Sequence, residues 1–184
     1  MWMDKGRKFS VRSVFFLTVL FGISTLNLSA QYDIDAMNYG VMLTKNAGNA
    51  EEIGVGIRAE YAFNCSTTFL AEFNHSFALG DDKSFTSYND WGIGVNVILF
   101  NWYPTTITAG MGYTGNDSKD FENVEDEAFL SIVAGSINHG AQVKIRALHQ
   151  LSEAVHIFAE ANIKSLGNRY HTFGIGISYD FYKG

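Results

Sequence analysis

The feature that most constrains this chain is a strict alternation of apolar and polar residues in its C-terminal third. Between Phe173 and Phe181 every second residue is Phe, Ile or Tyr, and the residues between them are Gly, Ser or Asp. The segments 141–147 and 155–163 alternate in the same way, with Phe158 as a departure. A period of two is that of a β-strand, whose side chains point alternately to opposite faces. These segments predict strands with one apolar face, which both soluble sandwiches and membrane barrels contain.

The same period recurs upstream, and the connections between the segments alternate in length. Further alternating segments are 39–43, 53–63, 69–77, 91–99 and 105–114. Tight turns are predicted at 64–67, 101–104 and near Ser152-Glu153, whereas 80–90 and the stretch from Gly115 onward are long and acidic. Short turns at one end and long loops at the other are typical of outer-membrane barrels, in which the short turns are periplasmic.

The segment from Phe129 to Ile137 leaves the number of strands open, because it is apolar enough to be a strand. If it is an outward extension of the sixth strand, bent near Asn138-His139-Gly140, the total is eight. If those three residues form a hairpin turn, the total is nine, and ten would need another strand near 84–88. Single-chain bacterial barrels have an even number of strands, so the sequence favours eight.

The N-terminus distinguishes a membrane barrel from a soluble sandwich. Residues 1–30 contain four basic residues, an apolar run from Val14 to Ile23, and Leu28-Ser29-Ala30 before Gln31, which is the layout of a secretory signal peptide. The run is shorter than the roughly 20 residues of a membrane-spanning helix. We predict cleavage after Ala30 and a barrel domain over 31–184, with an uncleaved anchor as the alternative. No later segment has the length and apolarity of such a helix, so membrane insertion must use strands.

Charge excludes one class of function. Without the four basic residues and the single acid of the leader, the formal charge changes from −6 to −9. A chain this acidic is a poor candidate for binding nucleic acid, whose phosphates attract basic proteins. Cys65 is the single cysteine, so no internal disulfide can form.

If the apolar rows face lipid, a polar set faces the lumen. The interior of an eight-stranded barrel is just wide enough for side chains to fill, and charges buried there need partners. Four charges of each sign predict a salt-bridged, plugged lumen rather than an ion-selective pore. The predicted network consists of Arg58, Glu60, Glu72, Lys144, Arg146, Glu160, Lys164 and Asp180.

The combination of a signal peptide, eight alternating segments, the Leu151-Ser152-Glu153 turn and the closing strand 173–181 resembles the small outer-membrane β-barrel proteins of the OmpA/OmpX type, especially those of Bacteroidetes-like bacteria. The resemblance implies an all-β, eight-stranded antiparallel up-and-down transmembrane barrel in the outer membrane of a Gram-negative bacterium. It also implies that the barrel-assembly machinery recognises the last strand through a terminal aromatic residue. Here Phe181-Tyr182 is followed by Lys183-Gly184, which departs from that pattern.

The sequence contains no catalytic signature, and we expect a non-enzymatic monomer without cofactor or metal. Its expected surroundings are outer-membrane lipid and lipopolysaccharide, and its expected role is envelope integrity or surface interaction through the outer loops. His75 and Ser76 point to opposite faces of a strand and cannot pair. His156, which faces inward and could reach Ser178, leaves open a lipid A-modifying enzyme. A small channel or uptake barrel is the other alternative, and cation binding by the acidic loop 117–127 also stays open.

Overall fold

The computed structural model describes residues 34–48, 52–79, 86–120 and 130–181. The predicted signal peptide and most of the acidic loop lie outside these residues. The barrel wall consists of eight strands: β1 (Met37–Asn46), β2 (Glu52–Asn64), β3 (Thr67–Ala78), β4 (Tyr88–Trp102), β5 (Thr105–Asn116), β7 (Ile137–Gln150), β8 (Val155–Lys164) and β9 (Thr172–Phe181). A short strand, β6 (Ser131–Ala134), and the 3-10 helix η3 (Asn168–Tyr170) complete the described elements.

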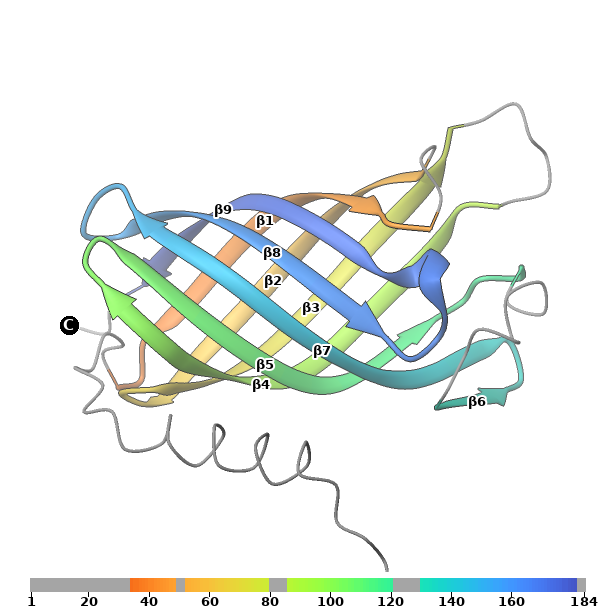
Figure 1. Ribbon diagram of the computed structural model, residues 1–184, viewed down its shortest axis with the longest axis horizontal. Helices are drawn as coiled ribbons and strands as arrows, with labels where there is room; N and C mark the ends of the chain where they lie inside the picture. Colours follow the sequence, from red (N-terminus) through yellow and green to blue (C-terminus); the bar gives the residue numbers. More distant parts are fainter. Residues whose placement is uncertain (1–33, 49–51, 80–85, 121–129, 182–184) are drawn as a thin grey trace, which may run out of the picture.

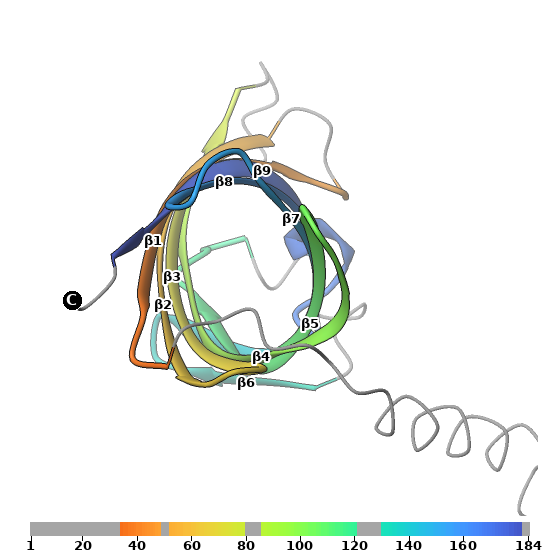
Figure 2. The same ribbon diagram turned by 90° about the vertical axis from the view of Figure 1, so that its left-hand side faces the viewer.

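The eight long strands form a closed antiparallel wall. Each pairs with its neighbours along the chain, β5 pairs directly with β7, and β1 pairs with β9 from Met37–Phe181 to Asn46–Thr172. The strands are tilted relative to the long axis (Figure 1), and the view from one end shows them as a ring (Figure 2). The prediction of an eight-stranded antiparallel barrel is confirmed.

The segment 129–137 is where the predicted structure was wrong in detail. Ser131–Ala134 forms β6, which turns at Gly135-Ser136 and pairs antiparallel with Ile137–Gly140 at the beginning of β7. Gly135 has a φ of 67°, which a residue without a side chain adopts readily. Asn138-His139-Gly140 is therefore neither a hairpin turn nor a bend, because it lies within β7. The hairpin adds β6 to the outer end of β7 without adding a ninth strand to the wall.

Connection lengths differ between the two ends of the barrel. The connections β2–β3, β4–β5 and β7–β8 are short and lie at the end where β1 begins and β9 ends, on the left of Figure 1. The connections β3–β4 and β5–β7, and η3, lie at the other end. We call these the tight-turn end and the loop end.

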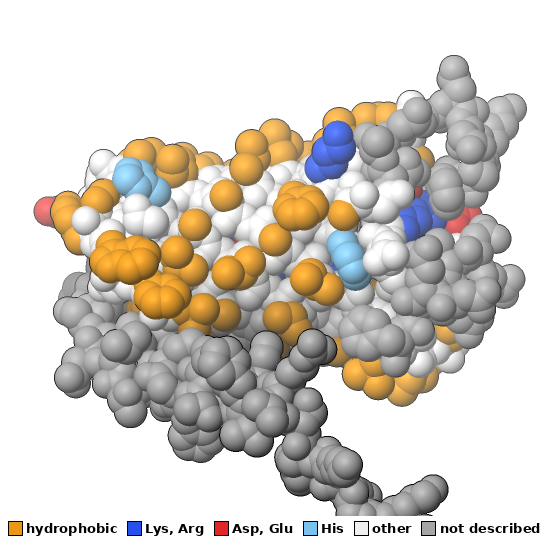
Figure 3. All heavy atoms as spheres, viewed as in Figure 1, with side chains coloured by type: hydrophobic (Ala, Val, Ile, Leu, Met, Phe, Trp, Pro, Cys, Tyr) orange, Lys and Arg blue, Asp and Glu red, His pale blue; other side chains and the backbone are white. Residues whose placement is uncertain are grey.

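The barrel has its apolar residues outside and its polar residues inside, which is the reverse of a soluble protein. Side chains such as Ile175 and Met111 are 63% and 72% exposed on the outer surface, whereas Arg146 and Lys164 are 2% and 1% exposed inside. Hydrophobic side chains are spread over the face shown in Figure 3. The described residues contain no helix that is long and apolar enough to cross a membrane.

Candidate functional site

The centre of the lumen is occupied by a charged network that begins at Glu60. Residues of even number on β2 and β7 face inward, so Glu60 and Arg146 meet across the lumen. The two guanidinium nitrogens of Arg146 each donate to a carboxylate oxygen of Glu60 at 2.8 Å. Thr68 and Asn96 donate to the same carboxylate at 2.5 Å and 2.7 Å. Such a bidentate pair with further donors satisfies a buried carboxylate well.

The network continues from Glu60 across four strands. Arg58 lies 3.5 Å from Glu60 and donates to Glu160 at 2.6 Å. Lys144 lies 3.5 Å from the other oxygen of Glu160 and forms an ion pair with Glu72. These six charged residues, three of each sign, therefore form one connected network rather than isolated pairs.

The two remaining residues of the predicted network have partners that the sequence analysis did not identify. Lys164 forms an ion pair with Asp90, which we had placed in a loop and which lies in β4 facing inward. Asp180 accepts a hydrogen bond from Asn38 at 2.5 Å and lies 3.6 Å from His156 at the tight-turn end. The pairing therefore differs from the predicted one, because Asp180 forms no close ion pair with a Lys or Arg side chain among the described residues.

A second group of charges lies at the loop end of the barrel around Arg169 of η3. Arg169 donates to Glu52 at 2.9 Å and 2.5 Å from two of its nitrogens, and to Asp120 at 3.3 Å. Its guanidinium carbon lies 5.5 Å and 5.7 Å from the ring centres of Tyr88 and Tyr170. We call this group the Arg169 cap. It links η3 to the ends of β2, β4 and β5.

Electrostatics at the cap favour a charged Asp120. Burial raises the pKa of this carboxyl, but hydrogen bonds from the backbone and hydroxyl of Thr86 and from Arg169 outweigh it, so the pKa lies below its ordinary value. Burial also raises the pKa of Tyr170, whose hydroxyl donates to Ser118 at 3.0 Å. The cap is therefore an ion-paired structure at neutral pH.

Replacing Arg169 with methionine is expected to open the cap, because Glu52 would be left buried without its cation. Limited proteolysis should then cleave the loop end at least several-fold faster, with mass spectrometry locating the cuts. Lys119→Met removes an exposed cation near the same end and serves as the control. Equal cleavage rates in the two variants would show that Arg169 does not hold the loops.

The charged side chains that are fully buried are balanced in sign. The buried charged side chains of the described residues are five bases and five acids: Arg58, Lys144, Arg146, Lys164, Arg169, Glu52, Glu60, Glu72, Asp90 and Glu160. Glu52 and Asp90 lie on the inward faces of β2 and β4, each two residues before an inward glycine, and this spacing was the signal that could have identified them. Arg169 lies outside any strand, and no periodicity indicates its position.

The arrangement around His156 bears on the enzymatic alternative. His156 on β8 pairs in register with Ser178 on β9, and Asp180 lies beside it. The hydroxyl of Ser178 is buried and forms no hydrogen bond with the described residues. All three side chains face the lumen at the tight-turn end, away from the surrounding lipid. The described residues contain no group of three or more His, Cys, Asp or Glu arranged to hold a metal ion.

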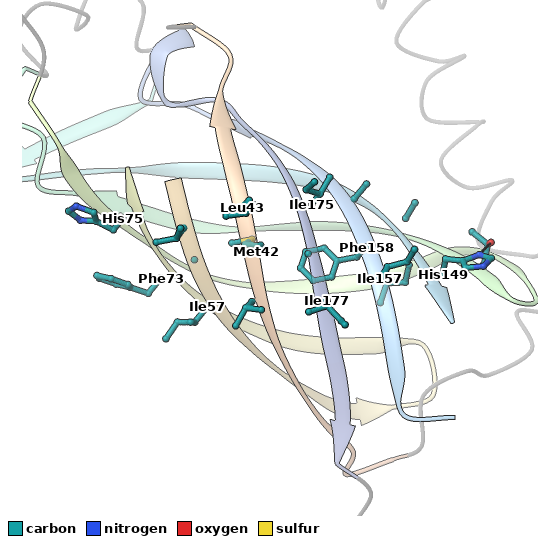
Figure 4. Close-up of a pocket in the computed structure, with 18 residues that line it drawn as sticks. Met42, Leu43, Ile57, Phe73, His75, His149, Ile157, Phe158, Ile175 and Ile177 are labelled. Atoms are coloured by element: carbon teal, nitrogen blue, oxygen red, sulfur yellow. Dashed lines mark hydrogen bonds between the residues drawn. The ribbon is translucent and has the colours of Figure 1, made fainter. Parts of the chain in front are cut away.

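The hollows of the outer surface are apolar. One of about 1100 Å³ has lining residues on β1, β2, β3, β5, β7, β8 and β9, among them the outward residues Ile57, Ile175 and Ile177 (Figure 4). Met42 and Phe158 also line it and belong to a small apolar cluster inside the wall. Its location and lining match contact with hydrocarbon rather than with a polar substrate.

Comparisons with known proteins bear on the fold. No protein-family model matches the sequence, and no curated protein matches it. A de novo designed transmembrane β-barrel is similar with a TM-score of 0.58 and 15% identity over 83% of this chain and 100% of the design. The N-terminal barrel domain of Pseudomonas aeruginosa OprF is similar with a TM-score of 0.56 and 10% identity over 80% of this chain and 98% of that domain. Neisserial surface protein A is similar with a TM-score of 0.50 and 10% identity over 79% and 93% of the two chains. This chain has the fold of the small eight-stranded outer-membrane β-barrels.

Proposed function

We propose that this chain is a non-enzymatic outer-membrane barrel whose lumen is closed by ion pairs and whose loop end faces outward for envelope integrity or surface contact. The observation that carries the proposal is the lumen itself, in which five acids and five bases are buried and paired across strands. An open channel would require these pairs to separate, and buried charges without partners are costly. A pore selective for one ion sign would also be expected to carry an excess of one charge, which the buried set of five acids and five bases lacks.

The apolar outer surface supports the proposal that the barrel is inserted in a membrane. Exposed apolar residues alternate with the buried polar ones on the strands of the wall, as lipid-facing rows do in membrane barrels. Tight turns at the end where β1 begins suggest that this end is periplasmic. In this proposal the barrel-assembly machinery inserts the chain, outer-membrane lipid and lipopolysaccharide surround it, and it functions as a monomer.

Planar-bilayer recordings test the closed lumen. We expect the inserted protein to give no discrete conductance steps, while a general porin in the same apparatus gives them. The position of a heat-modifiable band on a cold gel confirms that the inserted protein is folded. Reproducible steps from the folded protein would overturn the proposal in favour of a channel.

The enzymatic alternative has its own test. Expressing the His156→Ala variant in place of the native chain is expected to leave the mass spectrum of lipid A unchanged, because His156 faces the lumen at the tight-turn end. A change in acylation that depends on His156 would instead assign the barrel a lipid-modifying activity.

A further inference from the structure

Three polar ring groups converge on the outward face of the wall near the loop end. They are Trp91 on β4, Tyr113 on β5 and His139 on β7, and each is half-buried. The Tyr113 hydroxyl lies 2.6 Å from Nδ1 of His139. Gly115 pairs in register with Trp91 on one side and with His139 on the other.

The absence of a side chain at Gly115 allows two of these groups to approach the backbone closely. A Cβ atom at this position would lie only 2.7 Å from the Tyr113 hydroxyl and 2.8 Å from the indole nitrogen of Trp91. Because glycine has no side chain, the Tyr113 hydroxyl and the Trp91 indole nitrogen pack close over its buried backbone. We call Trp91, Tyr113, His139 and Gly115 the rim notch.

The rim notch offers hydrogen-bond donors to the membrane. The indole nitrogen of Trp91 can only donate. When Tyr113 donates to Nδ1 of His139, the other ring nitrogen of His139 carries the proton and is also a donor. Rings that combine an apolar body with a polar tip are enriched where membrane and water meet. The notch therefore fits a headgroup rich in oxygen acceptors.

An apolar groove shares Tyr113 with the rim notch. A hollow of about 560 Å³ on the wall is lined by Tyr113, Ile93 and Val95, continues past Phe69 and Ala71, and reaches Tyr61 and Met37 toward the tight-turn end. Ala71 is a small residue that pairs in register with Ile93, so the surface is lower there than at the neighbouring large side chains. Tyr113 lines both sites, which joins a polar notch to an apolar groove as in a binding site for an amphipathic molecule.

We propose that the rim notch and this groove bind one lipid A moiety of lipopolysaccharide, with sugar or ester oxygens accepting from Trp91 and His139 and one acyl chain lying in the groove. The choice of lipid A rests on the proposed function, which places the loop end on the outer side of the membrane, in the leaflet that lipopolysaccharide forms. The donors lie at that end, and the groove extends from them toward the membrane interior, in the direction that an acyl chain takes.

The chain contains a matched control for this site. Thr105 on β5 lies 2.9 Å from Nδ1 of His149 on β7, so a hydroxyl–imidazole pair joins the same two strands at the tight-turn end. The test compares Tyr113→Phe/His139→Leu with Thr105→Val/His149→Leu. Each full-length protein is expressed in a lipopolysaccharide-producing host and extracted from its outer membranes in mild detergent. Native mass spectrometry then counts lipid A and phospholipid molecules retained per protein.

We expect the rim-notch variant to retain about tenfold less lipid A, since loss of its hydrogen bonds corresponds to roughly one decade in affinity. The control variant should retain as much as the native protein. Equal retention in all three proteins, equal loss in both variants, or selective loss of phospholipid would overturn the proposal. Heat modifiability checks that each variant is folded, and a native protein that fails to insert into the outer membrane would contradict the proposed function instead.

Discussion

Replacing Glu60 with leucine is expected to lower the free energy of unfolding by about 3–5 kcal/mol, because Arg146 and Arg58 would stay buried without their shared carboxylate. Thr68 and Asn96 would also lose the acceptor of their hydrogen bonds. Urea titration of the protein in lipid vesicles, followed by the folded band on a cold gel, measures the change.

Two further variants make this test specific. Glu153→Gln alters an exposed carboxylate in the β7–β8 turn and is expected to change stability by no more than about 0.5 kcal/mol. The double variant Glu60→Leu/Arg146→Leu should be more stable than Glu60→Leu alone, because it also removes one of the two buried cations that have lost their partner. If Glu60→Leu were as stable as Glu153→Gln, the network would contribute nothing to the fold.

Replacing Gly112 with alanine is the second change with a large expected effect. Its Cβ would lie 2.1 Å from the carbonyl oxygen of Ile93 and 2.6 Å from Cα of Gly94, which are both backbone atoms of the neighbouring strand. The two strands can accommodate a methyl group only by moving apart, and overpacking of this kind costs about 1–3 kcal/mol or more. The yield of heat-modifiable protein after refolding and its urea midpoint should both fall.

Gly174 provides the matched control, since it also lies in a strand of the wall and faces inward. A Cβ there would have its nearest neighbour at 3.3 Å, the flexible side chain of Glu160. We therefore expect Gly174→Ala to fold with nearly native stability. A tolerated Gly112→Ala, or an equally damaging Gly174→Ala, would show that close approach of β4 and β5 does not explain the effect.

The faces of the strands could be predicted from the sequence because alternation is a local property. Each residue of the predicted lumen set lies on the inward side of its strand, including Arg58 and Glu160. Which charged residues pair with each other could not be predicted. Alternation shows which face of a strand a residue lies on, but not its position along the barrel axis. Tilt and register place Lys164 opposite Asp90, and leave Asp180 near the tight-turn end with Asn38 and His156.

The loop end was less predictable for a different reason. Arg169 lies in η3, where no repeating pattern restricts the side chain, and its contacts come from β2 and from residues flanking β4 and β5. The β6 hairpin depends on the turn at Gly135-Ser136, whose composition resembles that of the neighbouring Asn138-His139-Gly140. Local sequence indicated a reversal in this region without fixing which residues form it.

The pairing of β1 with β9 has a consequence for the assembly of the protein. The other neighbouring strands of the wall lie close together in sequence, whereas this ladder joins Met37 to Phe181. A partly synthesised chain without β9 has two unpaired strand edges, and such edges pair with other chains or expose polar backbone to hydrocarbon at high cost. A barrel that is open between β1 and β9 is therefore unstable in the bilayer. Entry into the membrane and closure of the barrel must be nearly one event, so a truncation within β9 should abolish stable insertion rather than weaken it.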